Sequence, residues 1–211
     1  WFGEARHGND LVADTVAQYP DRFIGVAFVT PHYPEEMVPE LERAFDILGM
    51  KFLKIYPDFL GRPIDDPAYF PVFEWCNDRG LAVLSHGTFG FDDRSVSVPK
   101  RFAGLAERFP RVSWVLAHAG AGGSSTSERA AVEAARTVPN LYLETAATKG
   151  EHGALEAVVD AVGADRILYG SDMPVFDARH QVGRIVTADI PDEDKKKILG
   201  LNAIKLLGLE E

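Results

Sequence analysis

Cysteine and long apolar segments are scarce in this sequence. Its 211 residues include one cysteine, Cys76, so no disulfide bond can form within the chain. A chain without disulfides is typical of a reducing compartment, and we expect a cytoplasmic protein. No apolar run approaches the roughly 20 residues that a membrane-spanning helix needs, so we expect no membrane partner.

Basic residues are outnumbered by acidic ones. The chain has 22 lysines and arginines against 32 aspartates and glutamates, which gives a formal net charge of -10 at pH 7. Because nucleic-acid binding relies on basic patches that neutralise phosphates, this balance argues against a nucleic-acid partner. We expect the partner to be a small-molecule substrate.

Several loops that carry common chemistries are missing. No Gly-x-Gly-x-x-Gly follows a strand and no Walker loop occurs, which argues against a nucleotide-binding fold. No Gly-x-Ser-x-Gly turn occurs either, which argues against a serine nucleophile. Cys76 lies in the middle of an apolar helical pattern, so we expect it to be a packed thiol.

The chain does contain a repeated strand–helix unit. Six short apolar strands alternate with amphipathic segments, and their ends fall about 30 residues apart, the length of a βα unit. Strands that are apolar at nearly every position predict a parallel sheet, either open and doubly wound or closed into a barrel. The missing nucleotide-binding loops favour the barrel. With no break in composition, we expect one domain over residues 1–211.

Element ends can be predicted from local signals. We expect Asn9 to be the N-cap of the first helix, because a side-chain amide there can satisfy free backbone groups. The apolar residues at 22–29 predict the first strand. We expect the last helix over residues 191–207, with acidic residues in its first turn and lysines after them.

Three strands end in residues of the types that commonly bind metal ions. His86 and His118 each end a strand, and Asp172 lies in a Gly-Ser-Asp turn that Pro174 stops. A single histidine at such a position is more often a hydrogen-bonded loop residue. The carboxyl ends of barrel strands converge on one mouth, however, so these three side chains can meet there. Imidazole and carboxylate ligands suit zinc or another divalent first-row metal.

Other residues near the same strand ends are candidate substrate contacts. Lys54 and Tyr56 lie on the strand that stops at Pro57, and Thr145 ends a later strand. Lys54 has two alternative roles: it could form an ion pair with an acidic residue, or it could be carboxylated and bridge two metals. A basic residue such as Lys54 or Arg94 at the mouth would favour an anionic substrate.

A set of motifs spread along nearly the whole chain resembles one family. These are the segments Tyr19–Gly25, Lys54–Pro57, Arg108–Pro110, Leu116–Gly120, Arg166–Pro174 and Ile198–Ala203. Together they resemble the amidohydrolase-related family, the branch of the amidohydrolase superfamily that contains aminocarboxymuconate-semialdehyde decarboxylase and related decarboxylases and hydrolases. The Gly-Ser-Asp-x-Pro element is the most specific of them.

The resemblance implies a fold, a metal and roles for the strand-end residues. Family members are (β/α)8 TIM barrels that bind one divalent metal, usually zinc, with manganese as the alternative. By position, this numbering would cover strands three to eight. His86 would be a metal ligand, and His118 would polarise the substrate or assist proton transfer. Asp172 would bind the metal and accept a proton from metal-bound water. A homodimer is also implied.

One family feature is absent from the sequence. Family members place a His-x-His pair on the first strand, and no His-x-His occurs in these 211 residues. We expect two further βα units, about 40 to 60 residues in all, to precede Trp1.

Three functions remain open at this point. The main expectation is an enzyme, a metal-dependent hydrolase that cleaves a small amide, lactone or ester with metal-activated water. The alternative is a metal-dependent nonoxidative decarboxylase of a small carboxylic acid on the same scaffold. The third is a metal-free barrel that serves as a binding domain.

Overall fold

The computed structural model describes residues 4–87, 97–120, 125–148 and 151–209. Six parallel strands form one sheet in which each strand pairs with the next along the chain. They are β1 (Val26–Phe28), β2 (Phe52–Ile55), β3 (Ala82–Ser85), β4 (Ser113–Leu116), β5 (Leu141–Glu144) and β6 (Ile167–Leu168). The expected parallel sheet is confirmed, and its strand order is that of a partial barrel.

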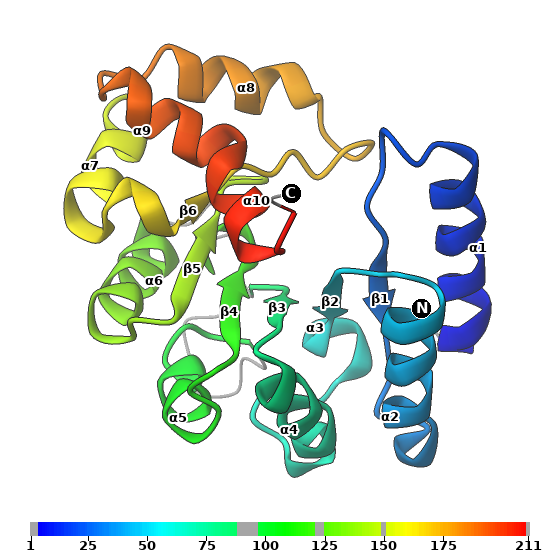
Figure 1. Cartoon of the computed structure of the whole chain (residues 1–211). Helices are drawn as coiled ribbons and strands as arrows, with labels where there is room; N and C mark the ends of the chain where they lie inside the picture. The colour runs from blue at the N-terminus through cyan, green and yellow to red at the C-terminus, as the bar shows by residue number, and fades with distance from the viewer. Residues whose placement is uncertain (1–3, 88–96, 121–124, 149–150, 210–211) are drawn as a thin grey trace.

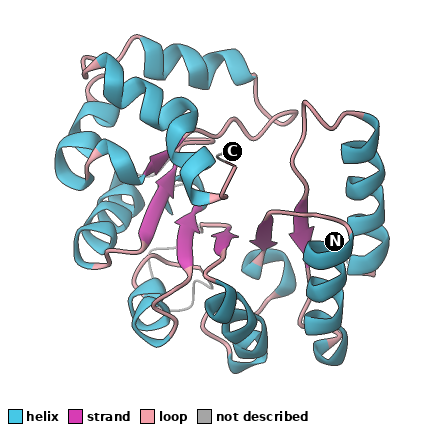
Figure 2. Ribbon diagram, viewed as in Figure 1, coloured by secondary structure: helices cyan, strands magenta, loops and turns pink. Residues whose placement is uncertain are grey.

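Helices connect the strands and surround them, as Figures 1 and 2 show. The α-helices are α1 (Ala5–Gln18), α2 (Pro34–Glu42), α3 (Pro57–Leu60), α4 (Phe70–Arg79), α5 (Arg101–Arg108), α6 (Ser125–Thr137), α7 (Ala154–Val162), α8 (Ala178–Val186), α9 (Asp192–Lys196) and α10 (Asn202–Leu206). Short 3₁₀ helices are η2 (Pro67–Tyr69), η3 (Ala117–Gly120) and η4 (Ala164–Arg166), and two π-helical turns are η1 (Arg43–Ile47) and η5 (Lys197–Leu201).

Strand alternation separates the core from the face that carries Lys54. Leu53, Ile55 and their counterparts in the other strands are buried in the core with residues of the surrounding helices. The residues of opposite parity lie side by side across the sheet, in a row formed by Phe28, Lys54, Leu84, Val115 and Tyr142. Because successive side chains point to opposite faces, Lys54 and Tyr56 share the face that lies away from this core.

Both outer strands are covered by a buried asparagine. The side-chain amide of Asn9 accepts a hydrogen bond from the Phe28 N–H at 2.9 Å and donates one to the Phe28 carbonyl at 3.0 Å. Asn202 donates to the carbonyls of Ala164 and Ile167 at 2.7 and 2.8 Å. These bonds satisfy backbone groups that a strand edge would otherwise leave unpaired.

Two expectations about elements are wrong, and a third is confirmed with an added feature. Asn9 is not an N-cap, because α1 begins at Ala5 and Asn9 is buried inside it. The first strand is shorter than 22–29, since only Val26–Phe28 pairs with a neighbour. The helix expected over 191–207 is confirmed as consecutive helical elements over 192–206, namely α9, η5 and α10, with the π-helical turn η5 at the centre. Within the described residues, no helix combines the length and apolarity that crossing a membrane requires.

Candidate functional site

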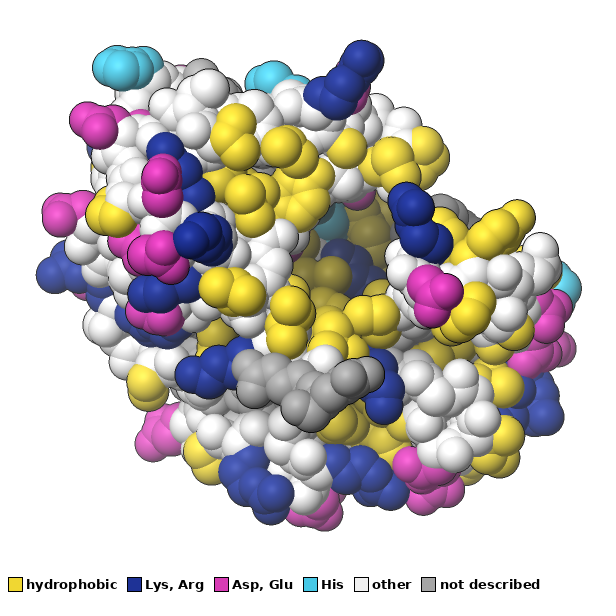
Figure 3. All heavy atoms as spheres, turned by 45° about the horizontal axis from the view of Figure 1, so that its top comes forward, with side chains coloured by type: hydrophobic (Ala, Val, Ile, Leu, Met, Phe, Trp, Pro, Cys, Tyr) yellow, Lys and Arg dark blue, Asp and Glu magenta, His cyan; other side chains and the backbone are white. Residues whose placement is uncertain are grey.

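The carboxyl ends of β2, β3 and β4 bring together an aromatic and imidazole cluster. The rings of His86 and His118 lie 5.0 Å apart at 75°, and the ring of Tyr56 stacks on His86 at 4.3 Å and 14°. The ammonium of Lys54 lies 5.4 Å from the centre of the Tyr56 ring. The structure therefore unites four residues predicted from their positions at strand ends. Figure 3 shows a hollow in the surface with histidine and basic side chains inside it and hydrophobic side chains around it.

A carboxylate sets the orientation of His86. Nδ1 of His86 lies 2.6 Å from Oδ2 of Asp58, which also accepts a hydrogen bond from the Ser97 hydroxyl at 3.0 Å. Since a carboxylate accepts, Nδ1 of His86 carries the hydrogen and Nε2 is left with its lone pair. Metal-binding histidines are commonly held by a carboxylate in this way.

His118 is oriented by the backbone of the next strand end. Nδ1 of His118 donates to the carbonyl of Ala146 at 3.0 Å, which leaves Nε2 as the acceptor. Its own backbone N–H donates to Oε2 of Glu144 at 3.1 Å. Burial, reinforced by the neighbouring His86, lowers the pKa of His118, whereas the Ala146 carbonyl acts in the opposite direction. The His118 imidazole is therefore neutral at pH 7, with Nε2 able to accept a proton.

Lys54 is the basic group of the cluster. Burial lowers its pKa to about 8, and the negative charges of Glu144, Asp172 and Asp58 offset part of that effect. Within the described part of the chain, its ammonium makes neither a hydrogen bond nor an ion pair, so the expected alternative of ion pairing is not seen. A cation that is still largely protonated at pH 7 and makes no direct ion pair with the described residues suits an anionic ligand. The other basic candidate, Arg94, lies outside the described residues.

Asp172 lies in the turn that follows β6. The negative charge of Asp172 raises the pKa values of both Lys54 and His118, so Asp172 lies close enough to interact with both. Its backbone is left-handed, with φ of 55°. Among the described non-glycine residues, positive φ occurs at Asp172, His118, Ala119 and Ala147, all at or just after the ends of β4, β5 and β6. Such conformations are costly away from glycine and concentrate at functional sites.

The donor atoms fit a divalent metal in kind. Two imidazoles, whose Nδ1 atoms contact Asp58 and Ala146, and a carboxylate are ligands that zinc and manganese accept. Within the described ranges, however, no group of three or more histidine, cysteine, aspartate or glutamate side chains is close enough to hold one ion. The predicted ligands His86 and Asp172 would therefore supply only part of a coordination shell.

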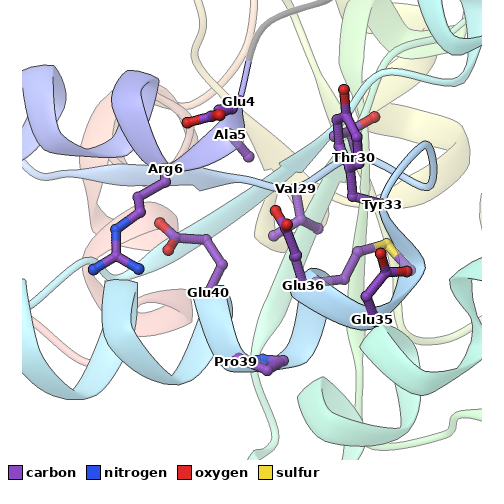
Figure 4. Close-up of a pocket in the computed structure, with 11 residues that line it drawn as sticks. Glu4, Ala5, Arg6, Val29, Thr30, Tyr33, Glu35, Glu36, Pro39 and Glu40 are labelled. Carbon is purple, nitrogen blue, oxygen red and sulfur yellow. The ribbon is translucent and has the colours of Figure 1, made fainter.

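Thr145 and a cavity beside α1 and α2 lie outside the imidazole cluster. Thr145 stays a prediction as a substrate contact, and its buried hydroxyl accepts a hydrogen bond from the Gly170 N–H at 3.2 Å. A separate cavity lies between the start of α1, the end of β1 and α2, and it contains none of the predicted site residues (Figure 4). Its lining includes Glu4, Glu35, Glu36 and Glu40.

Sequence reasoning missed the residues that support the cluster. Asp58 is 28 positions from His86, and Ser97 is 39 positions from Asp58, so neither contact is local in the sequence. Asp58 also follows directly on Pro57, where a turn is expected. Glu144 ends β5, but its role as a hydrogen-bond acceptor for two backbone N–H groups has no signature in the sequence. The position of Glu144 at a strand end was the one available signal.

Known proteins match the chain over almost its whole length. The chain is 25% identical to 2-amino-3-carboxymuconate-6-semialdehyde decarboxylase of Dictyostelium discoideum, over 98% of this chain and 67% of that protein. The crystal structure of 5-carboxyvanillate decarboxylase from Sphingomonas paucimobilis is 27% identical, with a TM-score of 0.77, over 97% of this chain and 72% of the other.

A second similar crystal structure holds a metal. It is a dihydroxybenzoic acid decarboxylase from Polaromonas sp. JS666 with bound manganese and an inhibitor, 23% identical with a TM-score of 0.74 over 98% of this chain and 75% of the other. The two relatives that are at least 25% identical are both decarboxylases, so they favour the alternative expectation and give no support to the hydrolase. The amidohydrolase family model matches residues 1–209. The chain therefore belongs to the amidohydrolase family, as its motifs predicted.

Proposed function

We propose that the protein is a metal-dependent nonoxidative decarboxylase of a small unsaturated or aromatic carboxylic acid. The observation that carries this proposal is Lys54, a cation without an ion-pair partner in the described chain, close to two histidines whose Nδ1 atoms are held by Asp58 and Ala146. A carboxylate substrate carries the negative charge that pairs with this cation, whereas a neutral amide, lactone or ester does not. The names of the relatives support the same reaction class.

The reaction requires a bound carboxylate and a proton. Loss of CO2 breaks the bond between the carboxyl carbon and its neighbour, and a C–H bond takes its place. In the proposed site, Lys54 binds the substrate anion and the flat face of the Tyr56–His86 stack borders an unsaturated substrate. The groups placed to carry the proton are Nε2 of His118 and the carboxylate of Asp172.

We assign metal binding to His86 and Asp172, the candidate ligands among the described residues. When bound, a divalent ion would supply Lewis-acid polarisation and orientation of the substrate. Manganese is the first ion to test, because a similar decarboxylase holds it, and zinc is the second. Asp58 would keep His86 in the tautomer that presents Nε2.

Product analysis tests the proposal. The protein loaded with Mn²⁺ is incubated with a panel of hydroxylated and aminated aromatic acids and, separately, with amides, lactones and esters. We expect CO2 release from at least one acid and no hydrolysis. Lys54→Met should raise KM for that acid, whereas Lys51→Met, an exposed lysine at the start of the same strand segment, should not. Hydrolysis without CO2 release would contradict the proposal.

A further inference from the structure

Glu144 is a buried carboxylate that holds two backbone groups. At the end of β5, only 9% of its surface is exposed. Its Oε2 accepts the His118 N–H at 3.1 Å, and its Oε1 accepts the Ala146 N–H at 2.6 Å. Both oxygens face donors, so the side chain is fixed at each end.

These two bonds determine where the His118 ring lies. His118 and Ala119 are left-handed, with φ of 60° and 44°, and this turn needs an acceptor for the His118 N–H. The peptide of Ala146 is held at its N–H by Glu144, and the adjoining carbonyl of Ala146 accepts the hydrogen on Nδ1 of His118. Glu144 thus fixes both the backbone that carries the ring and the residue that orients it.

The same carboxylate packs against the turn that follows β6. A Cβ atom at Gly170 would lie 1.3 Å from Oε1 of Glu144, so only glycine leaves room for the carboxylate there. Asp172 follows two residues later in this turn. Glu144 therefore contacts three strand ends at once, those of β4, β5 and β6.

We propose that Glu144 is a positioning residue that fixes the tautomer and direction of the His118 ring and, through Gly170, the turn that carries Asp172. The inference rests on the proposed function only for the role of His118 in the reaction. The contacts by which Glu144 holds His118 do not depend on that function. Glu144 itself is buried, and both of its carboxylate oxygens accept hydrogen bonds from backbone N–H groups.

The test uses Glu144→Gln, which keeps the shape but replaces one acceptor oxygen by a donor amide. One of the two N–H groups then loses its acceptor, so we expect the amide of His118 or Ala146 to exchange with deuterium at least about fivefold faster. We also expect the ring ¹⁵N shifts of His118 to change from the Nδ1–H tautomer to a mixture. Glu133→Gln, on the exposed face of α6, is the control and should change neither signal.

Unchanged ring shifts and unchanged exchange in a folded Glu144→Gln protein would overturn the proposal. Where that variant does not fold, the wild-type protein decides, since the proposal requires slow exchange of the His118 and Ala146 amides and an Nδ1–H tautomer at His118. Exchange at the rate of an exposed loop would overturn it. These readouts need neither metal nor substrate, so a failure to release CO2 would affect the proposed function and leave this result standing.

Discussion

Single side chains in the candidate site fall into two groups, those at or just after strand ends and those that orient them. The first group, His86, His118, Asp172 and Lys54, could be predicted because each lies at the end of an apolar strand, where parallel folds place their chemistry. The second group could not. Asp58 reaches His86 only because α3 turns back after β2, and no local pattern specifies that contact.

Asp58 provides a prediction at this scale. Asp58→Asn replaces the carboxylate that accepts from Nδ1 of His86, so the ring loses a strong acceptor that favours a free Nε2. We expect the affinity for Mn²⁺, measured by isothermal titration calorimetry, to fall about 10- to 100-fold. Asp46→Asn, an exposed residue 3.7 Å from Arg79, is the control and should bind as the wild type does. An Mn²⁺ affinity of Asp58→Asn equal to that of the wild type would contradict the assignment of His86 as a metal ligand.

Lys54 gives a pH-dependent prediction. Its pKa is about 8 in the folded chain against an ordinary value of 10.5, so between these values the unfolded chain binds more protons. The free energy of unfolding should therefore rise with pH across this window, and the full cost of burying the charge applies below pH 8.

Lys54→Met removes that cost. We expect the variant to be more stable than the wild type at pH 7, by on the order of 2 kcal/mol in urea unfolding, and the difference to close as the pH approaches 10.5. Lys51→Met, at an exposed position, should show no such trend. A difference that stays constant with pH would mean that Lys54 is not desolvated.

At the scale of elements, the strand order and the parallel sheet follow from the repeated unit, whereas the ends of elements do not. Asn9 has the composition of a helix cap, yet it sits within α1 and bonds to β1, because covering the edge of a strand satisfies two buried backbone groups. The π-helical turn η5 likewise has no sequence signature, and it accompanies the packing of the last helices on β6, where the Tyr169 N–H bonds to the Ile198 carbonyl.

The turn after β6 supplies the element-scale prediction. Gly170→Ala would place a methyl group against the carboxylate of Glu144, so either the side chain or the turn must move. We expect the free energy of unfolding to fall by about 1–3 kcal/mol, as in other overpacked sites. Gly104→Ala, on the exposed side of α5 with nothing near its Cβ position, should instead gain about 0.5–1 kcal/mol. If both variants gain stability in urea unfolding, Glu144 does not need the space at Gly170.

At the scale of the whole molecule, the parallel sheet brings the carboxyl ends of its strands to one side, and the candidate site residues lie there. The family and the barrel-type sheet could be predicted because motifs along nearly the whole chain agree. The reaction could not, since hydrolases and decarboxylases of this fold can share the same histidines and aspartate. In our proposal, the charge that the site offers a substrate separates them. Lys54 is recognised as a cation without an ion-pair partner among the described residues only once its surroundings are known.

The central claim is tested most directly by following a labelled carboxyl group. A panel of aromatic acids labelled with ¹³C in the carboxyl group is added to the Mn²⁺-loaded protein, and labelled CO2 and bicarbonate are measured by NMR. Asp172→Asn is the matched variant, because asparagine tolerates the left-handed backbone at that position while removing the charge. We predict label release by the wild type, at least about 100-fold slower release by Asp172→Asn, and loss of release when the metal is removed. Release at the wild-type rate by Asp172→Asn, or no release from any acid alongside hydrolysis of an ester or amide, would contradict the account.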